Sequence, residues 1–377
     1  MAIYIDIAAA VHGRAGLGRY AESLARALVA KDPERFALFF NRSGDVRPRP
    51  GLAGLEGVPA RSVRAGYKPW RMAVWLGQLA RLSFDRLLPG AELYHATEHL
   101  LMPLRRVPTV LTVHDLIFQM FPQHHKRLNY WYLNAALPLY CRRASAVIAV
   151  SEATKADLVR LYELDPAKIT VIHEAAEPHF APASPARIAA ARSRYQLPDH
   201  YLLHVGTIEP RKNLDRLLEA LHRLRAGGED VRLVVVGSKG WLYHSFFQQL
   251  EELALGDAVA LAGYVPDADL PAVYSGARLA VLPSLYEGFG LPVLEAMACG
   301  TPVVCSHTAS LPEVGGDAAR YFDPTDVAAM AGAIQTVWTD QALQDTMRQA
   351  GLARAAGFSW ARAADETLAV YDQVISP

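Results

Sequence analysis

Short apolar runs recur along the chain and alternate with longer segments whose apolar residues have helical spacing. Such uninterrupted runs are typical of strands that are buried on both faces of a parallel sheet. They form two series, separated by a proline-containing stretch at 173–185 that predicts a linker. The predicted strands are 3–7, 36–40, 93–95, 109–113, 146–150 and 169–172 in the first half, and 201–205, 231–236, 259–261, 277–282 and 303–305 in the second.

The segments between these runs predict helices, among them 20–30, 214–224 and an amphipathic helix at 358–371. Residues 42–66 predict a loop, and 122–143 predict a helical region. Strands that alternate with helices in both halves predict an α/β protein with two doubly wound parallel sheets. We therefore expect one domain at 1–177 and a second at 186–357, followed by a C-terminal helix within 358–377.

Length and composition agree with two domains. A chain of 377 residues is too long for one typical core, and its 51% apolar residues supply material for two. The three cysteines form neither a disulfide framework nor a metal-ligand pattern, which fits a reducing compartment. The first residues lack the basic region of a signal peptide, and no apolar run approaches the roughly 20 residues that span a bilayer. We expect a soluble cytoplasmic protein, at most peripheral on the inner face of the membrane.

Charge is balanced overall but unevenly distributed. Residues 1–180 hold 23 Lys and Arg against 16 Asp and Glu, and the remainder holds 15 against 22. The basic half indicates a surface for membranes or phosphates, with ordinary surface variation as the alternative. Within it, the basic and aromatic segment 61–86 resembles a helix that lies on membranes, or else a helix packed on its own domain with exposed arginines. We expect no nucleic-acid partner.

The stretch 282–304 carries the most specific chemistry. Glu287 precedes a predicted helix and Glu295 lies within it, so both carboxylates can face one cleft. A carboxylate accepts two hydroxyl hydrogen bonds well, which suits sugars and riboses. Gly288 and Gly290 let backbone amides approach a ligand closely. From spacing alone, a helix-start carboxylate beside a solvated one is the alternative.

A second polar segment follows the predicted strand 201–205. Arg211 and Lys212 lie just before the predicted helix 214–224, and two cations at a helix N-terminus can hold a diphosphate. Seen alone, they could equally be a solvated surface pair. Asp267 and Asp269 suggest a metal site, but we interpret them as helix-start residues near the positive end of a dipole. We therefore expect no metal.

The first half contains a glycine loop. Gly13, Gly16 and Gly18 precede the predicted helix 20–30, and a glycine loop that leads into a helix N-terminus can bind an anion. Their spacing is not the dinucleotide fingerprint, and a plain tight turn is the alternative.

Polar residues also follow later strands of the first half. His114 and Asp115 lie at the carboxyl end of 109–113, where open α/β sheets bind ligands. A lone histidine there is more often a structural hydrogen-bonding group. Ser151 is most simply the N-cap of the next helix.

These motifs together resemble one family. The pattern Glu-Gly-Phe-Gly-Leu-Pro-x-Leu-Glu-Ala-Met-Ala-x-Gly-x-Pro-Val, which starts at Glu287, resembles the E-x7-E signature of the retaining GT-B glycosyltransferases of family 4. Gly-x-x-x-Pro-Arg-Lys-Asn at 206–213, Thr-Val-His-Asp at 112–115 and the run 310–314 also resemble family segments. The resemblance implies the GT-B fold: two Rossmann-like domains that face a central cleft, with the C-terminal helix crossing back onto the first.

The resemblance also implies roles for these residues. Arg211 and Lys212 would neutralise the leaving diphosphate without a metal. Glu295 would bind the ribose, and Glu287 would hold the donor sugar. His114 would contact that sugar from the other domain. The remaining donor-binding positions are Gly16, Gly18, Gly206, Gly237, Val265, Gly288, Phe289, Gly290 and Leu291, and the acceptor side comprises Arg19, His114, Asp115 and Ser151.

The expected activity is retaining, metal-independent transfer of a hexose from a nucleotide-diphosphate sugar to a glycan or lipid-linked acceptor, without a further cofactor. The sequence as a whole resembles bacterial mannosyltransferases of surface polysaccharide assembly most. GDP-mannose is therefore the expected donor, and a UDP-hexose is the second candidate. Two other classes stay open: a nucleotide-sugar epimerase, and a non-catalytic protein that binds nucleotide sugars.

Overall fold

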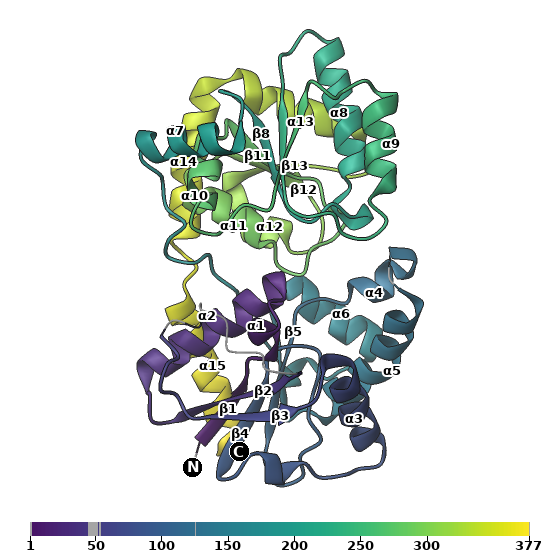
Figure 1. Cartoon of the computed structure of the whole chain (residues 1–377), viewed down its shortest axis with the longest axis vertical. Coiled ribbons are helices and arrows are strands. Elements are labelled where there is room, and N and C mark those ends of the chain that lie inside the picture. Colours follow the sequence, from purple (N-terminus) through teal and green to yellow (C-terminus); the bar gives the residue numbers. More distant parts are fainter. Residues whose placement is uncertain (1, 44–51, 53, 125, 377) are drawn as a thin grey trace. The chain divides into compact units, whose positions relative to one another are not determined.

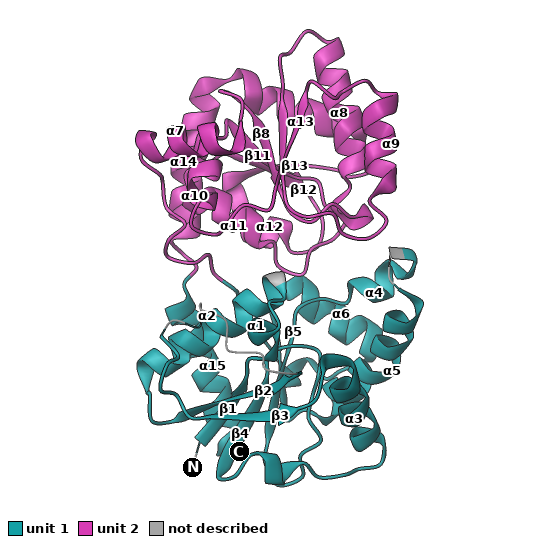
Figure 2. Ribbon diagram, in the orientation of Figure 1, with its two compact units in different colours: residues 1–174, 359–377 teal, residues 175–358 magenta. Residues whose placement is uncertain are grey.

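The computed structural model describes residues 2–43, 52, 54–124 and 126–376. The chain forms two compact units (Figure 2), the first made of Met1–Glu174 with Ser359–Pro377 and the second of Ala175–Phe358. The first boundary lies three residues before the end of the domain expected at 1–177, and residues 175–185 belong to unit 2. No helix in the described part of the chain has both the length and the apolarity needed to cross a bilayer.

Unit 1 is built on a seven-stranded parallel sheet with the order β3-β2-β1-β4-β5-β6-β7 (Figure 1). Chain order reverses between β1 and β4, which is the switch point where such sheets bind ligands. Buried aliphatic and aromatic side chains from both faces form its core. The strands are β1 (Ala2–Asp6), β2 (Phe36–Arg42), β3 (Ala60–Arg64), β4 (Ala91–Ala96), β5 (Thr109–Val113), β6 (Ala146–Ala149) and β7 (Ile169–Val171).

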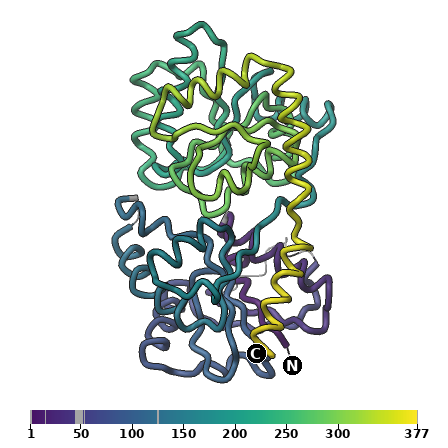
Figure 3. The backbone as a smooth tube through the Cα atoms, turned by 180° about the vertical axis from the view of Figure 1, so that it is seen from behind, coloured from purple at the N-terminus to yellow at the C-terminus, as the bar shows by residue number. Residues whose placement is uncertain are grey.

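Helices cover this sheet, and one of them comes from the far end of the chain. The C-terminal helix α15 (Trp360–Ile375) contacts α2 and β4 of unit 1, and Figure 3 shows the two chain termini side by side. Tyr371 Oη lies 2.6 Å from Nδ1 of His95 on β4. The other helices are α1 (Ala8–Val11), α2 (Ala15–Lys31), α3 (Tyr67–Leu79), α4 (Ile117–Met120), α5 (Arg127–Arg143) and α6 (Glu152–Tyr162), with short 3-10 turns at Asp85–Leu87, Pro122–His124 and Pro166–Lys168.

The predicted glycine loop is instead the beginning of a helix. α2 starts at Ala15, so Gly16 and Gly18 lie in its first turns and do not precede it. A Cβ on Gly18 would lie 2.9 Å from the backbone oxygen of Ala9, whereas one on Gly16 would meet nothing within 4 Å. Gly18 therefore serves the close approach of α2 to α1.

The segment 61–86 is a strand followed by a helix, and not one long helix. Its first residues form the edge strand β3, within the region predicted as loop, and α3 begins at Tyr67. Four of the five β3 residues are exposed, so the strand lacks the apolar run by which the others were predicted. α3 buries Trp70 and Val74 in the core but leaves Met72 and Leu76 exposed.

Unit 2 repeats the architecture with a six-stranded parallel sheet in the order β10-β9-β8-β11-β12-β13. The strands are β8 (Leu202–Val205), β9 (Leu233–Val236), β10 (Val259–Gly263), β11 (Leu279–Leu282), β12 (Val303–Ser306) and β13 (Ala319–Phe322). The helices are α7 (Pro185–Tyr195), α8 (Leu214–Ala226), α9 (His244–Glu252), α10 (Leu270–Gly276), α11 (Leu291–Ala298), α12 (Leu311–Gly315), α13 (Val327–Thr339) and α14 (Gln341–Ala355), with 3-10 turns at Pro210–Lys212 and Gly316–Ala318.

The two glycines of α2 provide a matched test of this packing. Gly18→Ala should destabilise unit 1 by about 1–3 kcal/mol, because the added methyl group overpacks against backbone that cannot move aside. Gly16→Ala should stabilise it by up to about 1 kcal/mol through helix propensity. Urea unfolding of both variants checks this, and equal effects would contradict the close α1–α2 approach.

Candidate active site

Most of the predicted donor-binding residues of unit 2 lie at one edge of its sheet. In a parallel sheet all the loops that follow the strands leave from the carboxyl edge, where open α/β sheets bind ligands. Gly206 follows β8, Gly237 follows β9, Val265 comes shortly after β10, and Glu287 follows β11. Residues from four separate parts of the sequence thus meet along this edge.

Four charged residues form the centre of this edge, here called the charge cluster: Glu209, Arg211, Lys212 and Glu287. Arg211 Nη1 donates to Glu287 Oε2 at 2.8 Å, and Lys212 Nζ donates to Glu287 Oε1 at 2.6 Å. Arg211 Nη2 also donates to Glu209 Oε1 at 2.7 Å. Lys212 and Glu287 are each 8% exposed. The signature glutamate is therefore the shared partner of both cations that were predicted to hold a diphosphate.

The electrostatics of the cluster favour the ionised form of Glu287. Burial alone would raise its pKa, but the charges of Arg211 and Lys212, with hydrogen bonds from Lys212 and Ser284, hold the pKa at about 2. Burial lowers the pKa of Lys212, and the neighbouring Glu287 opposes that shift. We take both groups as charged at neutral pH, because each is the other's hydrogen-bonded counter-ion at 2.6 Å.

Backbone geometry explains how two distant segments present these side chains to each other. Asn213 adopts a left-handed conformation with φ of 59° between the turn Pro210–Lys212 and α8. Its Nδ2 donates to the backbone oxygens of Pro283 and Pro324, at 3.0 and 2.8 Å. The amide of Leu285 donates to the Arg211 backbone oxygen at 2.9 Å. The Arg-Lys-Asn turn is thus fastened to the loop that carries Glu287.

Sequence reasoning missed three polar partners of the predicted residues. Glu209 and Ser284 bond the charge cluster, the latter by donating from Oγ to Glu287 Oε1 at 2.6 Å. Tyr274 donates from its hydroxyl to Glu295 Oε2 at 2.9 Å. Glu209 lies directly before Pro210, at an unspecified position of the quoted pattern Gly-x-x-x-Pro-Arg-Lys-Asn, and could have been singled out there, whereas Ser284 and Tyr274 carry no comparable signal.

Gly206 and Gly237 allow the loops after β8 and β9 to approach each other closely. Gly237 has φ of +146°, and a Cβ on it would lie 2.1 Å from the backbone oxygen of Gly206. A Cβ on Gly206 would in turn meet Nε2 of His204 at 3.1 Å and Cε of Lys212 at 3.5 Å. Gly237 therefore has no room for a side chain against the Gly206 backbone, and a side chain on Gly206 would press on His204 beside Lys212.

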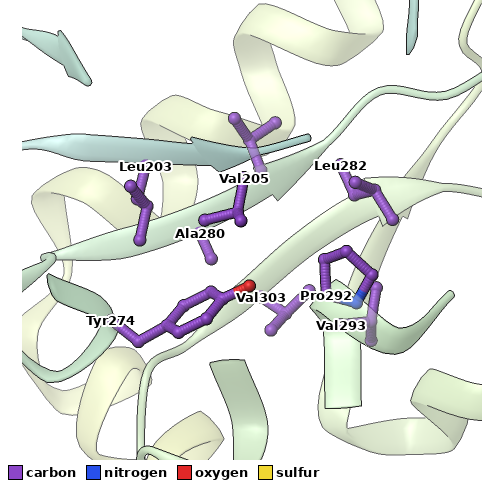
Figure 4. Close-up of a pocket in the computed structure, with 9 residues that line it drawn as sticks. Leu203, Val205, Tyr274, Ala280, Leu282, Pro292, Val293 and Val303 are labelled. Atoms are coloured by element: carbon purple, nitrogen blue, oxygen red, sulfur yellow. The ribbon is translucent and has the colours of Figure 1, made fainter. Parts of the chain in front are cut away.

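Glu295 lies on α11, which begins after Gly290 in a left-handed conformation, with Pro292 in its first turn. The carboxylate is 2% exposed. Figure 4 shows Tyr274, Val205 and Pro292 around a small apolar void between the sheet and this helix. At about 10 Å³ the void barely holds one water molecule, so α11 rests on a packed layer. Ser310, just before α12, donates to the backbone oxygen of Phe289 at 2.6 Å and ties the predicted 310–314 loop to the motif.

In unit 1, His114 follows β5 as expected, and all its polar atoms have partners. Nδ1 lies 3.1 Å from Glu174 Oε1, and Nε2 lies 2.9 Å from the backbone oxygen of Thr97. Its amide donates to His99 Nε2 and its carbonyl accepts from Thr154. Burial alone would lower the pKa of His114, but the hydrogen bond and charge of Glu174 outweigh it and raise the pKa.

The other acceptor-side residues have local structural partners. Ser151 is confirmed as the N-cap of α6, since its Oγ accepts from the Thr154 amide at 3.1 Å. Asp115 Oδ1 accepts from the Ile117 amide at 3.1 Å, where α4 begins. Arg19 is half-buried on α2.

A carboxylate pair at the same edge of unit 1 was not predicted. Asp6 ends β1, and Glu98 follows β4 with Oε2 2.7 Å from Arg14 Nη1. Burial and the Glu98 charge raise the pKa of Asp6 to about 7, although hydrogen bonds from Tyr94 and the Ala8 amide oppose the shift. The only sequence signal was a single acid at the end of the first strand.

Asp269 lies at the start of α10, as predicted, and its side chain has an additional role. It is the N-cap residue of α10, but its side chain accepts no hydrogen bond from that helix. The carboxylate instead accepts from Arg194 Nη1 at 3.0 Å and Tyr195 Oη at 2.5 Å, both on α7. Asp269 therefore links α7 to α10. Its carboxylate binds the Arg194 guanidinium and the Tyr195 hydroxyl in preference to the exposed backbone amides of α10.

The depressed pKa of Glu287 makes a testable contribution to acid stability. A folded-state pKa of about 2, against 4.5 for the free group, gives stabilisation that is complete above pH 4.5 and is lost as the pH falls towards 2. Glu287→Gln should cost about 3–5 kcal/mol at pH 7, because it leaves Lys212 buried without its counter-ion. The difference in unfolding free energy between Glu287→Gln and wild type should become smaller below pH 4.5.

Urea unfolding between pH 7 and pH 3 measures that gap. Glu366→Gln, which removes one partner of an exposed i,i+4 pair with Arg362, is the control and should stay within about 0.5 kcal/mol of wild type. A gap for Glu287→Gln that does not change with pH would show that the carboxylate is not held ionised by its partners.

Comparison with known proteins places these features in one family. Residues 14–180 match the family described as Glycosyltransferase Family 4, and residues 189–354 match Glycosyl transferases group 1. The chain is 33% identical over 375 residues to the O-antigen chain mannosyltransferase B of Escherichia coli. The alignment covers 94% of this chain and 95% of that protein. The chain is also 33% identical over 278 residues to the serotype-specific mannosyltransferase WbdA of Escherichia coli, which covers 70% of this chain but a third (33%) of that longer protein.

Solved structures show the same architecture. Sucrose-phosphate synthase from Thermosynechococcus elongatus superposes with a TM-score of 0.77 at 21% identity, covering 100% of both chains. Anabaena HepE in complex with UDP and glucose superposes with a TM-score of 0.76 at 20% identity, covering 99% of each chain. The predicted fold class is confirmed, and the chain belongs to the family 4 (group 1) glycosyltransferases of the GT-B fold.

Proposed function

We propose that this glycosyltransferase is a retaining mannosyltransferase that moves mannose from GDP-mannose to a hydroxyl of a glycan or lipid-linked acceptor in surface polysaccharide synthesis. The charge cluster carries the proposal, because it supplies two cations and a carboxylate at the ligand-binding edge of unit 2. The mannosyl donor is supported by the 33% identity to O-antigen chain mannosyltransferase B along 94% of the chain.

The two cations suit the leaving group of this reaction. As the glycosidic bond to the donor phosphate breaks, negative charge develops on the diphosphate, and fixed positive groups stabilise that charge. Arg211 offers a planar fork for phosphate oxygens, and Lys212 offers a point charge that the surrounding protein keeps nearly dry. These two residues do the work of a metal ion in the proposed reaction, so the reaction needs none.

Glu287 gives the site a way to exchange partners. Without ligand it pairs with both cations, and Glu209 supplies the second negative charge. A diphosphate that binds Arg211 and Lys212 replaces this carboxylate as their counter-ion, and Glu287 becomes available to accept hydroxyl hydrogen bonds from the donor sugar. Buried cations thus never lack a partner, which avoids the large cost of an uncompensated buried charge.

The remaining groups complete the proposed donor site. Glu295 accepts hydrogen bonds from the ribose hydroxyls, with Tyr274 holding its other oxygen. The backbone of Phe289 and Gly290 lies beside the sugar. In unit 1, a ligand hydroxyl that bonds to His114 Nε2 would displace the Thr97 backbone oxygen, which is the neutral one of the two ring partners.

Proton transfer in this scheme needs no base from the protein. The acceptor oxygen forms the new bond to the anomeric carbon on the face from which the phosphate oxygen leaves. The acceptor proton passes to that phosphate oxygen. The configuration at the anomeric carbon is thereby retained.

A UDP-hexose is the second candidate donor. Anabaena HepE, whose fold matches along 99% of both chains, is described in complex with UDP and glucose. Melting temperatures measured with a panel of nucleotide sugars distinguish the two candidate donors. The protein should be stabilised by GDP-mannose more than by UDP-glucose, since a ligand that binds the folded state alone raises its melting temperature. Transfer to a mannan-type oligosaccharide should persist in excess EDTA, and NMR should show the same anomeric configuration in donor and product.

A preference for UDP-glucose in that panel would replace the mannosyl assignment with the second candidate. Loss of activity in EDTA with rescue by manganese would overturn the proposed role of the two cations. An inverted product would overturn the proposed stereochemistry.

The two signature glutamates should differ in their kinetic effects. Glu287→Gln should lower kcat by about 10²–10³, because its contact with the sugar strengthens in the transition state, while GDP affinity is kept or increased since the cations lose their competitor. Glu295→Gln should weaken GDP binding about tenfold with a small effect on kcat, because the ribose contact already exists in the ground state.

Calorimetric titration with GDP beside steady-state kinetics checks this pair of variants. Tyr274→Phe is the control for Glu295, since it removes the hydrogen bond to that carboxylate and should weaken GDP binding by a smaller factor. The reverse pattern, in which Glu287→Gln loses GDP affinity and Glu295→Gln keeps it, would mean that the donor lies the other way round in the site.

A further inference from the structure

Unit 1 contains a cavity of about 500 Å³ that no step of the proposed reaction uses. It is lined by the C-terminal end of α3 and the turn after it, by the β4–β5 connection, by Thr109 at the start of β5 and by Arg143 at the end of α5. The first residue of β5 marks the amino edge of the parallel sheet, whereas His114 lies at the carboxyl edge. The cavity is therefore at the opposite edge of the sheet from the catalytic loops.

The cavity is strongly basic. Arg81, Arg105 and Arg143 line it, no Asp or Glu does, and within the described chain none of the three forms an ion pair. Arg143 Nη1 donates to Gln78 Oε1 at 2.8 Å, and the Arg105 guanidinium donates to the Arg81 backbone oxygen. Neutral oxygens thus position the guanidinium groups of Arg105 and Arg143 and leave their charges uncompensated. Three such charges around one concavity favour a phosphate-sized anion.

Asp85, the acidic residue nearest in sequence to Arg81, does not neutralise the positive charge of the cavity. Asp85 accepts hydrogen bonds from the backbone amides of Arg105 and Arg106 and from the Ser83 hydroxyl. Burial would raise the pKa of Asp85, but these hydrogen bonds outweigh it and lower the pKa. The carboxylate therefore shapes the β4–β5 connection and leaves the guanidinium groups unpaired.

An exposed apolar surface adjoins the cavity. Met72, Leu76 and Leu79 recur at i, i+4 and i+7 along α3 and are 43%, 53% and 53% exposed. Leu82, also 53% exposed, lies in the cavity wall. The opposite side of α3 packs Trp70 and Val74 into the core, so this helix carries apolar residues on the solvent side as well. Figure 1 shows α3 on the outside of unit 1.

We propose that α3 and the arginine cavity form a docking surface for a bilayer that contains anionic phospholipids. A lipid phosphate enters the cavity between Arg81, Arg105 and Arg143, while Met72, Leu76, Leu79 and Leu82 enter the boundary between headgroups and acyl chains. An apolar helical stripe beside unpaired basic residues has the two features that hold interfacial helices on anionic membranes. Charge complementarity selects this occupant, since a second copy of the chain would have to bring an acidic, apolar surface. This inference does not depend on the donor or the acceptor.

Vesicle sedimentation with the whole protein at about 0.1 M salt tests the proposal. The protein should sediment with phosphatidylcholine vesicles that contain phosphatidylglycerol, and far less with phosphatidylcholine alone. Arg81→Gln with Arg105→Gln should weaken this binding roughly 30-fold, since each basic residue at an anionic surface contributes about fivefold. Leu76→Gln with Leu79→Gln, which keeps the charge, should weaken it at least about tenfold through the lost apolar contact.

The matched control is Arg223→Gln with Arg320→Gln, two exposed arginines of unit 2, which removes the same charge elsewhere. This control should bind vesicles within twofold of wild type, and melting curves should show that all variants fold. An equal loss in the control, or no sedimentation with anionic vesicles, would overturn the proposal. Binding of inorganic phosphate without binding of vesicles would show a soluble-anion site instead. Self-association that Leu76→Gln with Leu79→Gln abolishes, again without vesicle binding, would show a dimer interface.

Discussion

The shared carboxylate of Glu287 is the interaction on which the proposed donor site depends. It lies between a guanidinium and an ammonium at 2.8 and 2.6 Å, in surroundings that leave Lys212 and Glu287 almost no contact with water. Charges removed from water in this way are tolerated when each has a counter-ion and further hydrogen bonds. Asn213, Ser284 and the close approach of Gly237 to Gly206 hold the loops that bring these charges together. Without the pairing, the loops after β8 and β11 would each carry a buried charge that the fold could not stabilise.

The same pairing connects stability with function. A site that is ready for a diphosphate must hold two positive charges close together before the ligand arrives, and an internal carboxylate makes that possible. Preorganised charges of this kind stabilise a developing anion without reorganisation during the reaction. The apolar layer under α11 has a parallel effect on Glu295, since packed side chains and Tyr274 leave that carboxylate little freedom. The charge cluster and Glu295 are both held rigidly, which suits a ligand that has a charged half and a hydroxyl-rich half.

Unit 1 uses its sheet differently at its two edges. At the carboxyl edge, polar groups are paired within the protein: His114 with Glu174, and Glu98 with Arg14. At the amino edge, the guanidinium groups of Arg105 and Arg143 donate to neutral oxygens and keep their charge. Internal pairing fits a site whose geometry must be fixed for a neutral, hydroxyl-bearing ligand. Unpaired arginines beside exposed leucines fit a surface that is completed by something outside the chain.

Much of the fold could be predicted from the sequence, and so could several residues that the structure brings together at the candidate site. Strands such as β9 and β11 are continuous apolar runs because both of their faces are buried, and residue type alone reveals that burial. The exposed edge strand β3 lacks such a run and was taken for a loop. The start of α2 was also misplaced, because glycine indicates a loop by local propensity, while here Gly18 is required by the contact with Ala9. Propensity is local, and tertiary packing overrides it.

At the site, the motifs identified Arg211, Lys212, Glu287 and Glu295 because their residue types and spacing are specific. Their pairing was decided by tertiary structure. Glu287 is 75 residues from Lys212, and only the parallel order of β8 and β11 brings the loops after those strands together. His114 and Glu174, 60 residues apart, meet for the same kind of reason. Sequence determines which charges exist, whereas the register of the strands determines which of them neutralise one another, because the energy of a charge depends on its neighbours in space.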